Sequence, residues 1–181
     1  STTFWLANGL GVAALLLTRP RWWPVLTATM AAMNVILAYY YHFSLTFSLL
    51  SAIANALEPL LCAVLVRYIL YDSVNLFRLR GAASFIAIVL VCTAFASLIG
   101  ATAVILYYGE SNYWPVWQQW FFGDALGIFL VTPVIMGWSS VDWRAIRSVP
   151  RRSIFEASGL LVVTGMAAYL FFESEPGRIP V

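Results

Sequence analysis

The sequence predicts an all-α, polytopic integral membrane protein: a bundle of about six transmembrane helices. The chain is 62% hydrophobic and only 10% charged, whereas a soluble domain is about 45–50% apolar and about 25% charged. Its apolar segments are separated by short polar or proline-marked breaks. Its arginines fall in alternate connections, as expected when successive helices cross a bilayer in opposite directions.

We expect helices near residues 4–18, 24–41, 45–70, 81–107, 115–138 and 153–172. Crossing the hydrocarbon core takes about 20 helical residues, and the last five segments meet this length. The first is short and carries Asn8, Gly9 and Gly11, so we expect it to be bent or cut at its start. Residues 1–181 then form a single transmembrane domain, with flanking segments of a longer protein missing on both sides.

Orientation follows from the basic residues, all of which are arginine. The connections near Arg21, Arg78 and Arg147 hold almost all of them, and the two intervening connections hold none. The positive-inside rule therefore places these three connections in the cytoplasm and both ends of the fragment outside it. The bilayer itself is the first expected partner.

Polar residues inside the apolar segments are the best pointers to function. A carboxylate at the bilayer centre costs roughly 2.5–3.5 kcal/mol on insertion scales. Glu58 lies about midway along its helix, and spacings of three and four residues place Ser51, Asn55 and Cys62 on the same face. Pro59 follows Glu58 and favours a kink.

The other carboxyl within a membrane segment is Asp124. It lies between Gly123 and Gly127, whose spacing lets a neighbouring helix come close. Trp120 is one turn earlier, and Pro133 lies later in the same helix.

These residues support two interpretations. One is a polar pocket reached from outside, lined by Asn8, Asn34, Asn55, Glu58 and Asp124. The other is hydrogen bonding that only joins helices, worth about 0.6 kcal/mol per bond on average. We interpret the asparagines, taken alone, as residues that only join helices by hydrogen bonds. We interpret the two carboxyls as functional residues.

Several chemistries find no support in the sequence. His42 is the only histidine, and the cysteines lie in apolar segments, so we expect no metal site. The sequence also shows no phosphate-binding glycine loop and no recognisable set of catalytic residues. It has no run of basic residues interleaved with polar ones, which a nucleic-acid binder would need. The sequence does not indicate a cofactor.

Four motifs occur in the order found in one known family. They are Trp5-Leu6-Ala7-Asn8-Gly9, Trp22-Trp23-Pro24, Asn55-Ala56-Leu57-Glu58, and the segment from Trp120 to Gly127 followed by Pro133. The chain resembles the first family of MASE-type membrane-associated sensor domains. Leu6-Ala7 departs from the pattern, since many members carry prolines before the asparagine.

The resemblance implies a central portion of a sensor domain of about eight helices in the bacterial inner membrane. Such domains precede histidine kinases and diguanylate cyclases, so it implies a cytoplasmic output domain in the same chain, with two-component or cyclic di-GMP signalling, and a homodimer. It also assigns Asn8, Asn34, Asn55, Glu58 and Asp124 to the family's polar core.

The residues alone leave two alternatives open. Carboxyls at mid-membrane and helices interrupted by glycine or proline also occur in small-molecule and ion transporters. The third interpretation is an assembly subunit whose Gly123 and Gly127 pack against a partner.

Overall fold

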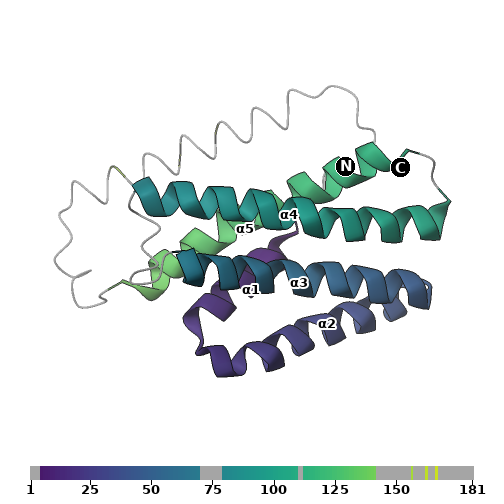
Figure 1. The fold of residues 1–181 in the computed structure, drawn as a ribbon, viewed down its shortest axis with the longest axis horizontal. Helices are drawn as coiled ribbons and strands as arrows, with labels where there is room; N and C mark the ends of the chain where they lie inside the picture. The colour runs from purple at the N-terminus through teal and green to yellow at the C-terminus, as the bar shows by residue number, and fades with distance from the viewer. Residues whose placement is uncertain are drawn as a thin grey trace. The chain divides into compact units, whose positions relative to one another are not determined.

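The computed structural model describes residues 5–69, 79–109 and 112–141, together with the single positions Glu156, Val162 and Met166. The chain forms two compact units, Ser1–Ser140 and Val141–Val181. All regular structure in the described residues is helical (Figure 1). The elements are α1 Leu6–Leu17, the 3-10 turn η1 Pro20–Trp22, α2 Trp23–Tyr40, α3 Leu45–Ile69, α4 Leu79–Tyr108 and α5 Tyr113–Ser139.

Four of these segments are long and apolar enough to cross a membrane: Pro20–Tyr40, Leu45–Ile69, Leu79–Tyr108 and Tyr113–Ser139. The expected count of about six is therefore not confirmed. Helix α1 has 12 residues and measures about 18 Å at 1.5 Å per residue, too short for a hydrocarbon core of about 30 Å. The segment expected at 153–172 lies outside the described residues except for Glu156, Val162 and Met166, which are helical.

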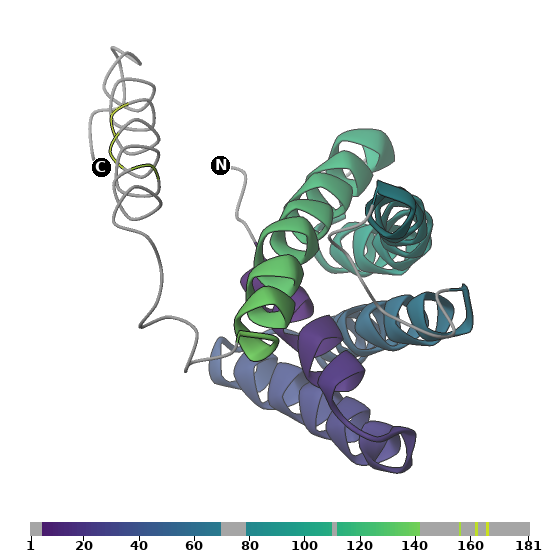
Figure 2. The ribbon, with the colours of Figure 1, turned by 90° about the vertical axis from the view of Figure 1, so that its left-hand side faces the viewer.

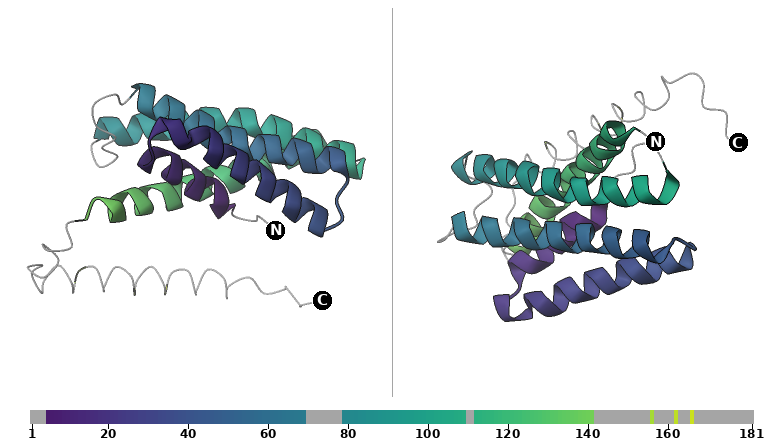
Figure 3. Two further views of the ribbon diagram at one scale, coloured as in Figure 1. Left: turned by 90° about the horizontal axis from the view of Figure 1, so that it is seen from below. Right: turned by 45° about the vertical axis from the view of Figure 1, so that its right-hand side comes forward.

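Within the first unit, four helices pack around a common axis. Helix α3 packs against α4, α4 against α5, and α5 against α1. Helix α1 in turn packs against α3, so the four helices form a closed ring. Helix α2 lies outside this ring against α3, and it buries only Trp23 and Ala38. The end-on view in Figure 2 and the oblique view in Figure 3 show α1 lying between α5 and the α2–α3 pair. The short helix therefore closes the ring.

Glycines allow α1 to come this close. A Cβ added at Gly127 of α5 would overlap the carbonyl of Trp5, and a Cβ at Gly9 would overlap the carbonyl of Gly127. On the opposite side of α1, a Cβ at Gly11 would lie 3.2 Å from ring carbons of Pro59. Backbones meet here without side chains between them, the usual arrangement where small residues face one another in membrane proteins.

Hydrogen bonds fix α1 along its length. The Trp5 backbone N–H donates to the carbonyl of Gly123 at 3.4 Å. The Thr132 hydroxyl donates to the carbonyl of Gly9 at 2.9 Å, and the Trp23 indole N–H donates to the carbonyl of Leu15 at 2.7 Å. Helix α1 is thus attached to α5 at its start and to α2 at its end.

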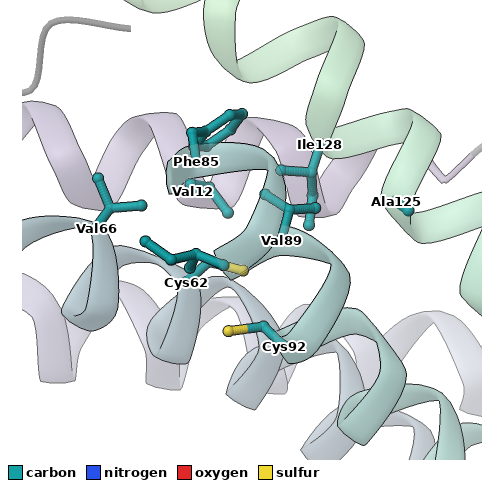
Figure 4. Close-up of a cluster of buried hydrophobic side chains, with 9 residues drawn as sticks. Val12, Cys62, Val66, Phe85, Val89, Cys92, Ala125 and Ile128 are labelled. Carbon is teal, nitrogen blue, oxygen red and sulfur yellow. The ribbon is translucent and has the colours of Figure 1, made fainter. Parts of the chain in front are cut away.

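An apolar cluster fills the ring on one side of the polar residues. It contains Val12, Cys62, Val66, Phe85, Ile88, Val89, Cys92, Ala125 and Ile128. Figure 4 shows the sulfur atoms of Cys62 and Cys92 on the facing sides of α3 and α4. Both cysteines are free thiols and are buried. They therefore serve as small apolar side chains in the packing between these helices.

The prolines do not interrupt the described helices. Pro59 lies inside α3 and Pro133 inside α5, and both helices continue through them. Each proline lacks the N–H that would bond to the carbonyl four residues earlier. The helix continues through Pro59, whose ring packs against Gly11, and the kink expected there stays a prediction.

Candidate functional site

The centre of the ring holds a hydrogen bond between α1 and α3. The side-chain N–H of Asn8 donates to Oε2 of Glu58 at 2.5 Å. Glu58 is completely buried and Asn8 is 2% exposed. The Asn8 amide donates to a carboxyl oxygen that would otherwise be buried without a partner, and this bond lowers the cost of burying both groups.

The rest of this polar core comes from α4. Thr93 and Ser97 are completely buried. The Thr93 side chain lies close enough to the Glu58 carboxyl to interact with it, whereas the Ser97 hydroxyl has no hydrogen-bond partner in the described residues. The second carboxyl oxygen of Glu58 also lacks one. Unpaired buried polar atoms are uncommon in folded proteins. Their grouping here marks the core as a place where a small rearrangement would create new hydrogen bonds.

Asp124 places a second carboxyl on the same axis. Its side chain is 4% exposed, and it is close enough to Glu58 for the two to interact electrostatically. Because both carboxyls are buried, repulsion between two ionised carboxylates would raise the energy of this state.

A third polar contact joins α2 to α3. The side-chain N–H of Asn55 donates to the Asn34 side-chain oxygen at 2.9 Å. The Asn55 side-chain oxygen is itself buried and has no described partner. This contact joins α2 to α3, as the bond from Trp23 to the Leu15 carbonyl joins α2 to α1.

A cavity of about 540 Å³ lies beside the polar core. Polar side chains that line it are Asn34, Asn55, Ser51, Gln119 and Asp124. Aromatic side chains form much of the remaining wall, namely Trp5, Tyr41, Phe43, Phe47, Tyr108 and Trp120. The cavity runs from the ends of α2 and α4 to the middle of α5. Its volume falls within the range of small-molecule sites, about 300–1,000 Å³.

Trp120 is held in this wall by close packing. A Cβ added at Gly100 of α4 would overlap the Trp120 indole ring, so the ring lies directly on the α4 backbone. The neighbouring Trp117 donates its indole N–H to the carbonyl of Ala94 at 3.2 Å. These contacts fix the α5 aromatic side chains against α4.

The residues singled out from the sequence thus divide into two groups. Asn34, Asn55, Trp120 and Asp124 line the cavity, whereas Asn8 and Glu58 form the buried pair and are not part of its lining. Gly123 and Gly127 face α1.

Sequence reasoning missed the α4 hydroxyls and most of the aromatic wall. Thr93 and Ser97 are four residues apart, which places them on one helix face and was the available signal. Within the aromatic wall, Tyr41 and Tyr108 lie at helix ends, where aromatic side chains more often mark the membrane interface than a ligand site.

No group of three or more His, Cys, Asp or Glu side chains suited to a metal ion occurs among the described residues. Cys62 and Cys92 provide the only described pair of adjacent thiols. The chemistry available at this site is thus hydrogen bonding and charge, with aromatic surface beside it.

Comparison with known families gives one match, to MASE1, over residues 1–179. The chain belongs to the MASE1 family. The match covers nearly the whole of this MASE1 chain and confirms the resemblance drawn from the four motifs. Neither the comparison with curated proteins nor that with solved structures gave a match.

Membership of MASE1 and the four apolar spans identify a multi-pass membrane domain of the sensor type. Three of the motifs meet at the centre of the described MASE1 ring. Trp5 directly precedes α1 and Asn8 lies within it, Asn55 and Glu58 come from α3, and Asp124 comes from α5. The fourth motif, which includes Trp23, attaches α2 to the end of α1.

Proposed function

We propose that this domain is the sensory input of a bacterial signalling protein. It lies in the inner membrane and passes a signal to a cytoplasmic histidine kinase or diguanylate cyclase domain in the same chain. The three arginine-rich connections near Arg21, Arg78 and Arg147 face the cytoplasm. The aromatic cavity then faces the extracytoplasmic side, because it lies near the α2–α3 and α4–α5 connections, which hold no arginine.

The observation that carries this proposal is the docking of α1. A helix too short to span the bilayer is held by glycine contacts and by the Asn8–Glu58 hydrogen bond, next to a cavity and several unpaired polar atoms. A shift of this helix would change the Asn8–Glu58 bond and the glycine contacts together. Its end is attached to α2 through Trp23, so a change at Glu58 reaches the connection near Arg21.

The mechanism is a shift between two packings of the ring. A stimulus changes their ratio only by as much as it binds one packing better than the other. In the described packing Asn8 bonds to Glu58 and Thr93 lies beside the same carboxyl, while Ser97 has no described partner. In the second packing the Ser97 hydroxyl would bond to a carboxyl oxygen.

Dimerisation supports the output step. Kinases and cyclases of this kind act as dimers, so we propose a homodimer in which each domain biases its own cytoplasmic output. Exposed apolar side chains cover the outer faces of α2 and α4, and lipid or a second copy can pack there.

A transporter is the second candidate, favoured by one observation. Half-length helices that begin beside polar residues at mid-membrane are typical of transporter binding sites, and α1 begins beside Gly123 and Asp124. Uptake of a labelled solute into liposomes holding the complete protein would support this alternative. The assembly-subunit alternative has lost its main support, because Gly123 and Gly127 are already covered by α1.

The test of the sensor proposal replaces this domain by an unrelated helical anchor with the same end topology in the complete protein. Output is then measured as autophosphorylation or cyclic di-GMP synthesis across a panel of growth conditions. We expect the native protein to respond to at least one condition and the anchored version to give constant output. An identical response from both proteins would contradict a sensory role.

A further inference from the structure

The cavity beside Asp124 has a composition that restricts what it can bind. Among the described residues that line it, Asp124 is the only one with an acidic or basic side chain apart from tyrosine phenols, and none is an arginine, lysine or histidine. Asp124 is only 4% exposed and forms part of the cavity lining.

We propose that this cavity binds an organic ammonium ion with an apolar or aromatic body. The ammonium group pairs with Asp124, and the body lies against the aromatic wall. The role of this ligand as a signal rests on the proposed sensory function, whereas its binding does not.

Charge excludes the opposite ligand class. An anion in this cavity would face a carboxyl with no described positive side chain nearby, and an unpaired charge away from water is costly. A neutral apolar ligand would leave Asp124 without a partner. A cation supplies both the opposite charge and N–H or N–CH groups that the Asp124 oxygens, and the neighbouring Asn34 side chain, can accept.

The aromatic wall favours the same class. Rings attract a cation placed over their faces, by about 0.5–1 kcal/mol at exposed sites and about 2 when water is excluded. Trp5 and Trp120 lie on the α1 and α5 sides of the cavity, and Tyr41 and Tyr108 lie toward its outer end. Because Trp120 is packed on Gly100 and cannot move away, its ring is already positioned before a ligand enters.

The polar side chains of the cavity wall would orient a bound ligand. Asn34 and Asn55 are joined at 2.9 Å on the α2–α3 side, facing the α5 side that carries Asp124. A ligand that spans the cavity would place its cationic end at Asp124 and its body toward Phe43 and Phe47. The site thus selects by charge at one end and by apolar contact at the other.

The test uses three probes of one size and different charge: 2-phenylethylammonium, 2-phenylethanol and phenylacetate. The complete protein is placed in phosphatidylcholine nanodiscs, and binding is measured by equilibrium dialysis with empty nanodiscs subtracted. We expect the ammonium ion to bind at least tenfold more tightly than the alcohol, and phenylacetate not to bind. Equal affinity for the ammonium ion and the alcohol in the native protein would overturn the proposal.

Variants locate the selectivity. Asp124→Asn should reduce the ammonium-to-alcohol ratio to near one, and retained alcohol binding would demonstrate an intact cavity. Thr29→Val, a polar change on the exposed side of α2 and outside the cavity lining, should keep the native ratio. An unchanged ammonium-to-alcohol ratio in Asp124→Asn would overturn the assignment. If that variant does not fold, the test is the ratio of the native protein and its reduction in Trp120→Leu.

These results separate the ligand from the sensory function. Ammonium selectivity in a protein whose output never responds to any condition would uphold the site and contradict the sensor. A responsive output in a protein without ammonium selectivity would support the sensory function and contradict the binding site.

Discussion

Asn8 of α1 donates its side-chain N–H to Glu58 of α3, two residues 50 positions apart in the chain and both within the buried ring. The bond joins the one described α-helix too short to span the bilayer to α3, the most buried of the four helices that are long enough. The stability of the short helix and the environment of the carboxyl therefore depend on each other.

Loss of the Asn8 amide should destabilise the domain. Asn8→Ala removes the donor and leaves Glu58 without its described partner, at a cost of about 0.6–1.7 kcal/mol as found for hydrogen bonds between membrane helices. The measurement is the midpoint of unfolding in mixed dodecylmaltoside and SDS micelles. Thr29→Val, a polar change on the exposed side of α2, is the control. Equal midpoints for both variants would argue against a stabilising bond.

A side chain at Gly127 should displace α1. The Cβ of Gly127→Ala would overlap the carbonyl of Trp5, and we expect a loss of about 1–3 kcal/mol in the free energy of unfolding, as for overpacked cores. The same unfolding titration measures it. Leu130→Ala, at a position 56% exposed on α5, should change stability far less. A Gly127→Ala protein as stable as the native one would disprove the close approach.

The two cysteines should be inaccessible in the folded protein. Cys62 and Cys92 are 0% and 2% exposed in the packing of α3 against α4 (Figure 4). A charged, membrane-impermeant maleimide should add no label to the native protein in nanodiscs and two labels after SDS unfolding, counted by intact-mass spectrometry. Rapid labelling of either thiol in the native state would contradict the packing of these helices.

The proposed orientation can be tested with single cysteines in a Cys62→Ala, Cys92→Ala background. Asn112→Cys lies in the α4–α5 connection and Pro20→Cys in the α1–α2 connection. An impermeant maleimide added to whole cells should label the first and spare the second, because arginines accumulate on the cytoplasmic side. The reverse pattern would invert the topology and place the cavity on the cytoplasmic side.

Local patterns predicted the long helices and their buried faces well. Spacings of three and four residues placed Ser51, Asn55, Glu58 and Cys62 on one face of α3, and all four are buried there. The pair Gly123 and Gly127 indicated a close helix approach, and Trp5 occupies that position. These features depend on helix periodicity and side-chain size, which one sequence contains.

The sequence did not predict which residues of different helices contact one another. One of the two interpretations placed the five polar residues in a single pocket, but tertiary packing puts Asn8 and Glu58 in a closed core and leaves Asn34, Asn55 and Asp124 at the cavity. Periodicity fixes which face of a helix a residue is on, but the neighbour it meets depends on how helices cross. The twelve-residue length of α1 was suggested by Asn8, Gly9 and Gly11, yet its place in the ring was not.

The most direct test of the sensory account is the output of the complete protein carrying Glu58→Gln or Asp124→Asn. Kinase or cyclase activity is measured in membranes with matched amounts of inserted protein, and Thr29→Val serves as control. The account predicts that each carboxyl variant inserts normally but shifts output away from the native level, while the control does not. Native output from both carboxyl variants would contradict the claim that this polar core controls the signal.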